Sequence, residues 1–214
     1  MDTLHRLDDQ LMTDVNDVAR HTGWLHGAVL GYASYGVVLF AVLLLAGLWL
    51  RRAAADRALA AAGWAPLAVL LAVALNQPLV SAFAEVRPYT TQPGLLVLAT
   101  RSSDFSFPSD HAVMAGAAAA ALWLVSRALG VLATVAALVM AFARLYIAAH
   151  YPWDVAAGLV FGALVALVGW LLLRRLLTVL TGWLHARPGL RQAFPAPTIL
   201  LVGREPSTRE ASAA

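Results

Sequence analysis

The residues best suited to chemistry include an arginine, a histidine and an aspartate at a regular spacing. Five residues separate Arg144 from His150, and three separate His150 from Asp154. Pro152 predicts the first position of a helix, so His150 lies just before this helix and Asp154 within its first turn. Asp154 can then accept the proton of one ring nitrogen of His150 and leave the other nitrogen free for nucleophilic attack.

A second stretch, Phe107-Pro108-Ser109-Asp110-His111, comes directly before an apolar run. Ser109 is predicted to be the N-cap of a helix, and the free N–H groups at a helix start favour an anion. The guanidinium groups of Arg87 and Arg144 suit bidentate hydrogen bonds to phosphate oxygens. His111 is suited to protonate a leaving oxygen and later to activate water. These residue types together favour phosphoryl chemistry.

The His150–Asp154 pair also has plainer interpretations, as a structural hydrogen bond or as two metal ligands. A metal site would need further ligands, which His111 and Asp110 could supply. Three nearby arginines would repel a cation, so we expect no metal site. The arginines in question are Arg87, Arg101 and Arg144.

Other polar residues have structural interpretations as well. Arg87 could serve only as an interfacial cap, and Asn76 with Gln77 could hold helices together. The remaining histidines have no charged companion pattern and are expected to be ordinary surface or interface residues. These histidines are His5, His21, His26 and His185.

The elements that position these residues are predicted to be membrane helices. Of the 214 residues, 61% are hydrophobic and only 13% are charged, and the mean hydropathy is +0.73. This composition excludes a disordered protein and disfavours a soluble enzyme. The chain has no cysteine, which excludes disulfides, thiolate metal sites and a cysteine nucleophile. The net charge of +3 comes without lysine, and we attribute it to membrane orientation rather than to nucleic-acid binding.

Five uncharged apolar stretches predict an all-α integral membrane bundle of about five transmembrane helices. Two of the stretches are short for a span, because about 20 residues are needed to cross a bilayer. The last three stretches are rich in glycine and alanine and should pack tightly. The stretches are Val29–Leu50, Trp64–Ala84, His111–Ser126, Ala128–Ala143 and Val155–Leu173.

The arginines outside the expected site predict the orientation of the bundle. They follow the first span, separate the third from the fourth, and close the fifth, so alternating spans place them on one side, which is read as cytoplasmic. The loop from Glu85 to Asp110 and the turn from Tyr146 to Asp154 then face outward. These orienting arginines are Arg51, Arg52, Arg57, Arg127, Arg174 and Arg175.

The chain divides into three predicted parts. Residues 1–28 lack the basic start and apolar core of a signal peptide and instead show an amphipathic helix. Its apolar stripe consists of Leu4, Leu7, Leu11, Val15, Val18, Thr22 and Leu25. Residues 29–177 form the transmembrane domain. Residues 178–214 form a cytoplasmic tail that is expected to be largely disordered.

At the level of motifs, the chain resembles the type 2 phosphatidic acid phosphatase family of membrane lipid phosphatases. The family pattern is K-x6-R-P, then P-S-G-H, then S-R-x5-H-x3-D. Arg87-Pro88 matches the first motif, Pro108-Ser109-Asp110-His111 the second, and Arg144, His150 and Asp154 the third. The resemblance extends from about Asn76 to Gly169.

Three positions depart from the family pattern. Val80 stands where the family has lysine, Asp110 where it has glycine, and Ala143 where it has serine. The Pro-Ser-Asp-His variant is similar to bacterial members that act on undecaprenyl diphosphate. Arg101 could replace the charge lost at Val80. The family usually has six spans, and the amphipathic N-terminal helix could stand where the first of them would be.

The resemblance implies a metal-independent, two-step hydrolysis without a cofactor. His150 is then the nucleophile that forms a phosphohistidine, His111 the acid and later the base, and Asp154 the residue that orients His150. The resemblance and the loop charges together assign phosphate binding to Arg87, Arg144, Ser109, Asp110 and Arg101. Phosphoryl transfer requires mainly positioning and charge stabilisation, which such a set supplies.

The favoured function is hydrolysis of a polyprenyl diphosphate at the outer face of a bacterial inner membrane, during cell-wall lipid recycling. The lysine-free, alanine-rich composition resembles that of high-GC bacteria. The alternatives are a phosphatidate or phosphatidylglycerophosphate phosphatase, a phosphotransferase, and a catalytically silent lipid-phosphate binder that lacks the charge at Val80. A channel or transporter is disfavoured because the polar residues gather at one face of the membrane. The expected partners are the lipid substrate and membrane lipids, with no nucleic acid.

Overall fold

The computed structural model describes residues 2–187, 189 and 193–195, and within them it contains helices and no strand. The all-α prediction is therefore confirmed. The elements are α1 (Asp2–His21), the 3₁₀ turn η1 (Gly23–Leu25), α2 (His26–Arg51), α3 (Asp56–Phe83), α4 (Pro88–Thr91), α5 (Asp110–Val125), α6 (Arg127–Tyr146) and α7 (Pro152–Ala186).

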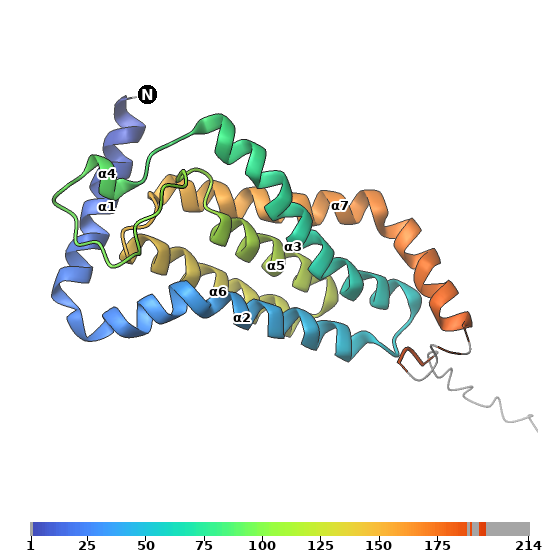
Figure 1. Cartoon of the computed structure of the whole chain (residues 1–214). Helices are drawn as coiled ribbons and strands as arrows, with labels where there is room; N and C mark the ends of the chain where they lie inside the picture. The colour runs from blue at the N-terminus through green and yellow to red at the C-terminus, as the bar shows by residue number, and fades with distance from the viewer. Residues whose placement is uncertain (1, 188, 190–192, 196–214) are drawn as a thin grey trace, which may run out of the picture.

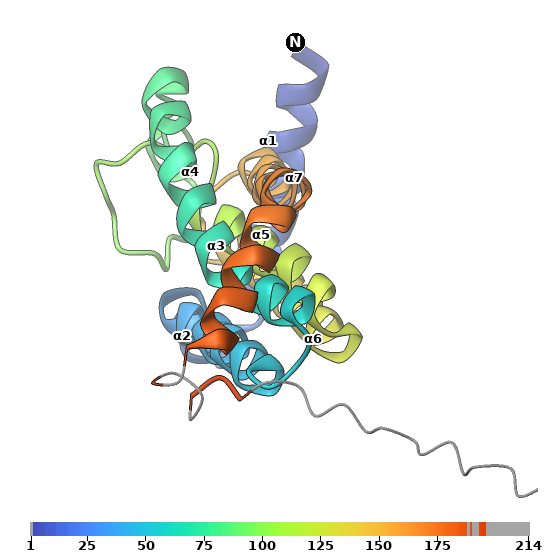
Figure 2. The same ribbon diagram turned by 90° about the vertical axis from the view of Figure 1, so that its right-hand side faces the viewer.

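The core of the molecule is a bundle of five helices (Figure 1), each of which matches one of the predicted apolar stretches to within one residue or extends beyond it. Within the described chain, four helical segments are long and apolar enough to cross a membrane, whereas α5 has only 16 residues. Helix α5 lies in the middle of the bundle and packs against α3, α6 and α7 (Figure 2). Protein therefore covers most of this short helix, and ten of its residues are buried.

Small residues allow α5 and α7 to approach each other closely, as predicted. A Cβ atom on Gly158 would lie 2.9 Å from both the Ala112 Cβ atom and the Ser109 carbonyl oxygen. A Cβ atom on Gly162 would lie 2.8 Å from the Ala117 nitrogen. Only hydrogen fits at such distances, so these glycines set the spacing between the two helices that carry Ser109 and Asp154.

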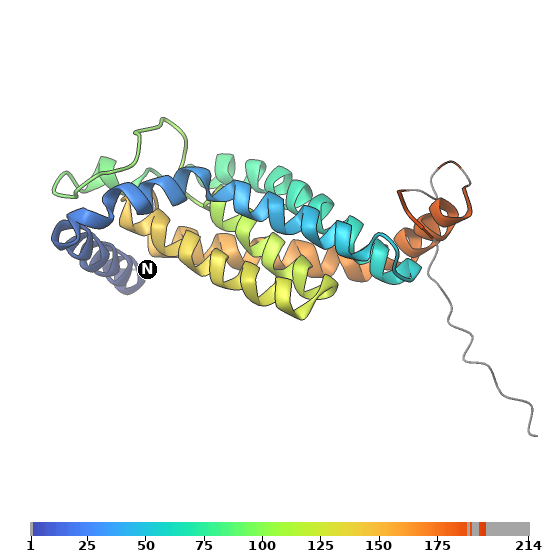
Figure 3. The same cartoon turned by 90° about the horizontal axis from the view of Figure 1, so that it is seen from below.

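Helix α1 lies at the same end of the bundle as α4 and its loop (Figures 1 and 3). The predicted apolar stripe is only partly packed: Val15 and Leu25 pack against a buried cluster, whereas Leu7, Leu11 and Val18 are about half exposed. Met12 and Asn16, which lie outside the stripe, are buried. Asn16 anchors the helix, because its amide donates to the Leu96 carbonyl and accepts from the Leu96 N–H, at 2.8 and 2.9 Å. The leucine stripe is thus left on the outer surface, where a membrane interface would cover it. The predicted N-terminal segment 1–28 comprises α1, η1 and the start of α2.

Helix α7 continues to Ala186, nine residues into the segment 178–214 that is predicted to be the tail. The extension packs against the start of α3. His185 lies 2.7 Å from the Asp56 carboxylate, and the Thr181 hydroxyl donates to the Asp56 carbonyl at 2.9 Å. These contacts extend the helix beyond its apolar part. The expected disorder of residues 196–214 concerns residues outside the described part of the chain.

Candidate active site

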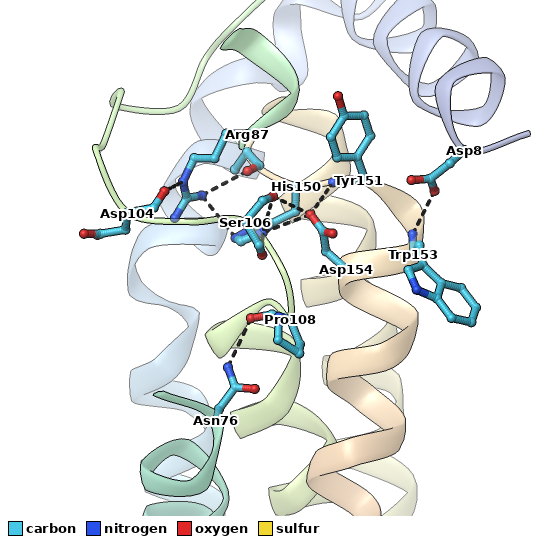
Figure 4. A network of polar contacts seen from close by, with 11 residues as sticks. Asp8, Asn76, Arg87, Asp104, Ser106, Pro108, His150, Tyr151, Trp153 and Asp154 are labelled. Atoms are coloured by element: carbon cyan, nitrogen blue, oxygen red, sulfur yellow. Dashed lines mark hydrogen bonds and ion pairs between the residues drawn. The ribbon is translucent and has the colours of Figure 1, made fainter. Parts of the chain in front are cut away.

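Three segments that lie far apart in the sequence meet at one end of the bundle (Figure 4). The turn between α6 and α7 carries His150, and the first turn of α7 carries Asp154. The loop that precedes α5 contributes Ser106, and the N-cap of α4 contributes Arg87. The expected set of His111, His150, Arg87 and Arg144 therefore converges on one place, as the lining of a common cavity shows.

The cavity has a volume of about 490 Å³ and lies next to Arg87, the residue before α4. Its lining combines two arginines, two histidines and two aspartates with residues of α3. The lining residues are Gln77, Val80, Ser81, Arg87, Ser103, Asp104, Phe105, Pro108, Asp110, His111, Arg144 and His150.

The hydrogen bonds of His150 define which ring nitrogen carries the proton. The imidazole is buried, with 3% of the residue exposed, and Nδ1 lies 2.9 Å from the Ser106 carbonyl oxygen. A carbonyl oxygen only accepts hydrogen bonds, so Nδ1 must be the donor. Nε2 lies 3.3 Å from Nη1 of Arg87, which only donates, so Nε2 must present its lone pair. The nitrogen without a proton is therefore the one that faces the cavity arginine.

The predicted bond from His150 to Asp154 is replaced by a less direct arrangement. Asp154 Oδ2 lies 3.5 Å from His150 Nδ1, beyond the usual length of an N–H···O bond. The same oxygen accepts a short hydrogen bond from the Ser106 hydroxyl and another, of 2.8 Å, from the Tyr151 N–H. The Ser106 carbonyl, which lies closer, thus accepts the hydrogen bond from the imidazole that the prediction gave to Asp154.

Arg87 is held in place by two backbone carbonyls. Its Nε donates to the Asp104 carbonyl at 2.9 Å, and its Nη1 donates to the Ala149 carbonyl at 3.0 Å. Pro88 begins α4 directly after it, which matches the preference of proline for the first helical position. The guanidinium group thus joins the loop before α5 to the turn before α7.

Two polar donors at the site have no hydrogen-bond partner in the described structure. Ser109 is the N-cap residue of α5, but its hydroxyl makes no capping bond, contrary to the prediction, and is buried and unpaired. The Nε atom of Arg144 is also buried and unpaired. Unpaired buried donors are costly, so Arg144, which lines the cavity, favours an anion there, whereas Ser109 is absent from the lining.

Asp110 lines the cavity, but its carboxylate is engaged by α3. Its Oδ1 atom accepts from the Asn76 amide at 2.8 Å and from the Gln77 amide at 3.0 Å. Asn76 also donates to the Pro108 carbonyl at 3.1 Å, so this polar pair joins α3 to the start of α5. A carboxylate repels an anion, which leaves the backbone N–H of Asp110, at the helix start, as the group that suits phosphate.

Two further residues bear on the missing family lysine. Val80 lines the cavity, so a lysine at this position would place its ammonium group at the same site. Arg101 is absent from the lining, and its guanidinium carbon lies 5.4 Å from the centroid of the Tyr89 ring. The described residues contain no group of three or more His, Cys, Asp or Glu that could hold a metal ion.

The electrostatic setting favours the neutral form of His150. Burial is the largest cause, and the positive charges of Arg144 and Arg87 add to it, so the pKa of His150 is well below its usual value. A neutral imidazole retains the lone pair that nucleophilic attack requires.

Ser106 is the residue that the sequence reasoning missed. It is fully buried, and its side-chain partner lies 48 positions further along the chain. No spacing or periodicity marks a lone loop serine of this kind. The nearest available signal is its place two residues before Pro108, beside the predicted anion site.

Comparisons with known proteins agree with the predicted family. The model described as "PAP2 superfamily" matches residues 61–177. The chain is 31% identical to Bacitracin transport permease protein BcrC of Bacillus licheniformis over 72% of this chain and 74% of that protein. It is 26% identical to Undecaprenyl-diphosphatase BcrC of Bacillus subtilis over 73% of this chain and 79% of that protein.

The fold also resembles that of a solved structure, a transmembrane PAP2 type phosphatidylglycerolphosphate phosphatase from Bacillus subtilis. The TM-score is 0.59 at 19% identity, and the match covers 78% of this chain and 85% of that chain. At this level of identity the likeness bears on the fold alone.

Proposed function

Because the chain belongs to the PAP2 superfamily, we propose that it is a membrane lipid phosphatase that acts through a phosphohistidine on His150. The observation that carries this proposal is the convergence of the unprotonated Nε2 of His150 with Arg87 on one cavity. The unpaired donors of Ser109 and Arg144 support it, because they suit a phosphoryl group.

In the first step, the Nε2 lone pair of His150 attacks phosphorus and forms a P–N bond. The bond from phosphorus to the leaving oxygen breaks, and His111, in its imidazolium form, donates a proton to that oxygen and becomes neutral. Arg87, Arg144, the Ser109 hydroxyl and the backbone N–H of Asp110 hold the phosphoryl oxygens. Negative charge that develops on these oxygens is met by donors already in position, which lowers the barrier.

In the second step, water attacks the phosphohistidine. His111, which has lost its proton, takes one from the water, and the P–N bond breaks to return neutral His150. Throughout both steps the proton stays on Nδ1 and is donated in a hydrogen bond to the Ser106 carbonyl, and the Asp154 carboxylate lies near enough to stabilise positive charge on the ring.

For the substrate, we favour a polyprenyl diphosphate at the outer face of a bacterial inner membrane. The B. subtilis relative named Undecaprenyl-diphosphatase supports this choice of lipid. Arginines support the orientation, since Arg51 and Arg52 stand at the end of α2 and Arg127 begins α6. These helix ends lie at the opposite end of the bundle from α4 (Figure 1).

A panel of lipid phosphates assayed for phosphate release in detergent tests the proposal. The panel contains undecaprenyl diphosphate, phosphatidate and phosphatidylglycerophosphate, each with and without a chelator. We expect the fastest release from the diphosphate and no effect of the chelator. Loss of activity with the chelator would contradict the metal-independent mechanism, and equal or faster release from phosphatidate would redirect the substrate assignment.

The matched variants are His150→Ala and His21→Ala. His21 is exposed on α1, and it is absent from the cavity lining. We expect His150→Ala to lose at least about a thousandfold in kcat and to trap no acid-labile phosphoryl label, because the nucleophile is gone. His21→Ala should keep both properties. A fully active His150→Ala protein would refute the mechanism.

A further inference from the structure

We propose that Ser106 is a positioning residue that sets the tautomer of His150 and couples it to Asp154. The inference rests on the proposed function, and it assigns to a loop serine part of the role that the motif gives to Asp154 alone. Two groups of Ser106 are involved: its backbone carbonyl, which accepts from Nδ1, and its hydroxyl, which donates to Asp154 Oδ2 (Figure 4).

The backbone carbonyl of Ser106 determines where the imidazole proton lies. It is 2.9 Å from Nδ1, whereas the nearer carboxylate oxygen is 3.5 Å away. A neutral carbonyl keeps the proton on Nδ1 in the ground state without creating a buried charge pair beside the nucleophile. Nε2 consequently faces the cavity with its lone pair.

The hydroxyl of Ser106 keeps Asp154 at this distance. Its single proton goes to Oδ2, which also accepts from the Tyr151 N–H, so two donors other than the imidazole occupy this oxygen. The hydroxyl oxygen lies 3.3 Å from Nδ1, between the two side chains. The negative charge of Asp154 therefore acts on His150 across Ser106. Its interaction with the imidazole becomes favourable when phosphorylation makes the ring positive.

Ser106 is itself held from two sides, which a positioning role requires. Its N–H donates to the Glu85 carbonyl at 2.7 Å, just beyond α3, and its hydroxyl reaches the first turn of α7. The residue is fully buried, so water does not compete for these bonds. A shift of α3 or α7 would thus change the orientation of His150 through this serine.

The test is a double-mutant cycle of Ser106→Ala and Asp154→Asn, assayed for phosphate release from undecaprenyl diphosphate. Ser106→Ala keeps the carbonyl and removes the hydroxyl, whereas an asparagine oxygen at 154 can still accept from both donors but carries no charge. We expect each single variant to lose roughly 10- to 100-fold in kcat with KM within about threefold, as for residues that orient a functional histidine. We expect the double variant to be no slower than the slower single variant.

Ser102→Ala is the matched control, because the Ser102 hydroxyl donates to the Asp104 carboxylate at 2.7 Å on the same loop but is exposed. It should keep wild-type kcat. Unchanged kcat in Ser106→Ala, a change confined to KM, or losses that multiply in the double variant would each overturn the inference. If Ser106→Ala fails to fold, Ser106→Cys, which keeps a similar volume and a weaker donor, takes its place in the same cycle.

Nuclear magnetic resonance of ¹⁵N-histidine-labelled wild-type protein supplies a readout that is independent of activity. With the His150 signal assigned from its loss in His150→Gln, we expect a proton on Nδ1 and none on Nε2. A proton on Nε2 would overturn the inference even in an active enzyme. Wild-type protein that released no phosphate from any lipid in the panel would instead refute the proposed function.

Discussion

Replacing Gly158 by alanine tests whether the spacing of α5 and α7 controls the site. The added methyl carbon would lie 2.9 Å from the Ala112 Cβ atom and from the Ser109 carbonyl oxygen. Carbon atoms in contact normally lie about 3.5–4.0 Å apart, so the helices must separate by roughly 0.6–1 Å. Ser109 is at the contact itself, and its N–H donates to the Asp154 carbonyl at 3.1 Å.

Two consequences of this separation can be estimated. Overpacking of this kind costs about 1–3 kcal/mol of stability. A misplacement of about 1 Å in a catalytic constellation costs on the order of 100-fold in rate, because the phosphate-binding serine and the nucleophile no longer meet the same phosphoryl group. We therefore expect Gly158→Ala to remain helical, to melt at a lower temperature and to lose on the order of 100-fold in kcat.

Phosphate release from undecaprenyl diphosphate and thermal unfolding in the same detergent measure both effects. Gly31→Ala on α2 is the control, because its methyl group would meet no atom within 4 Å. It should keep full activity and wild-type or slightly higher stability, since alanine is the better helix former. A Gly158→Ala protein with wild-type melting and wild-type kcat would refute the view that close helix contact positions the site.

The remaining predictions concern charge. Val80→Lys places an ammonium group at the cavity and should lower KM for the lipid phosphate by roughly tenfold in steady-state kinetics. Val80→Met is the uncharged control, and a KM equal to that of this control would contradict the prediction. Because the pKa of His150 lies below its usual value, the unfolded chain binds more protons than the folded one below about pH 6.5. Stability should therefore fall as the pH decreases from about 6.5, and His150→Gln should show a shallower fall in melting temperature between pH 7 and 5. An identical slope in the two proteins would show that folding leaves the pKa of His150 unchanged.

The transmembrane helices could be predicted because their signal is local. A run of apolar residues long enough to cross a bilayer must form a helix there, since each backbone polar group needs a partner within the same segment. Glycine and alanine in the last three stretches likewise predicted close packing. The end of α7 was harder, because the contacts of Thr181 and His185 with Asp56 extend it beyond its apolar part.

The packed face of α1 could not be predicted from its pattern. The periodic leucines favoured one stripe, but the fully buried residues Met12 and Asn16 lie outside it, because a bidentate amide contact with Leu96 holds the helix. For a protein in contact with lipid, an apolar stripe does not have to face protein. Periodicity therefore indicated the helix without indicating which neighbour would cover it.

The sequence by itself determined the helical membrane class and the residue types of the site, because hydropathy and the spacing of Arg144, His150 and Asp154 are properties of the chain alone. Only the tertiary structure decided which group accepts the hydrogen bond from Nδ1 of His150. Ser106 reaches His150 from 44 positions away, and its carbonyl is closer to Nδ1 than the Asp154 carboxylate is. Hydrogen bonds depend on distances of a few tenths of an ångström between segments, and those distances follow from how α5 and α7 pack against each other.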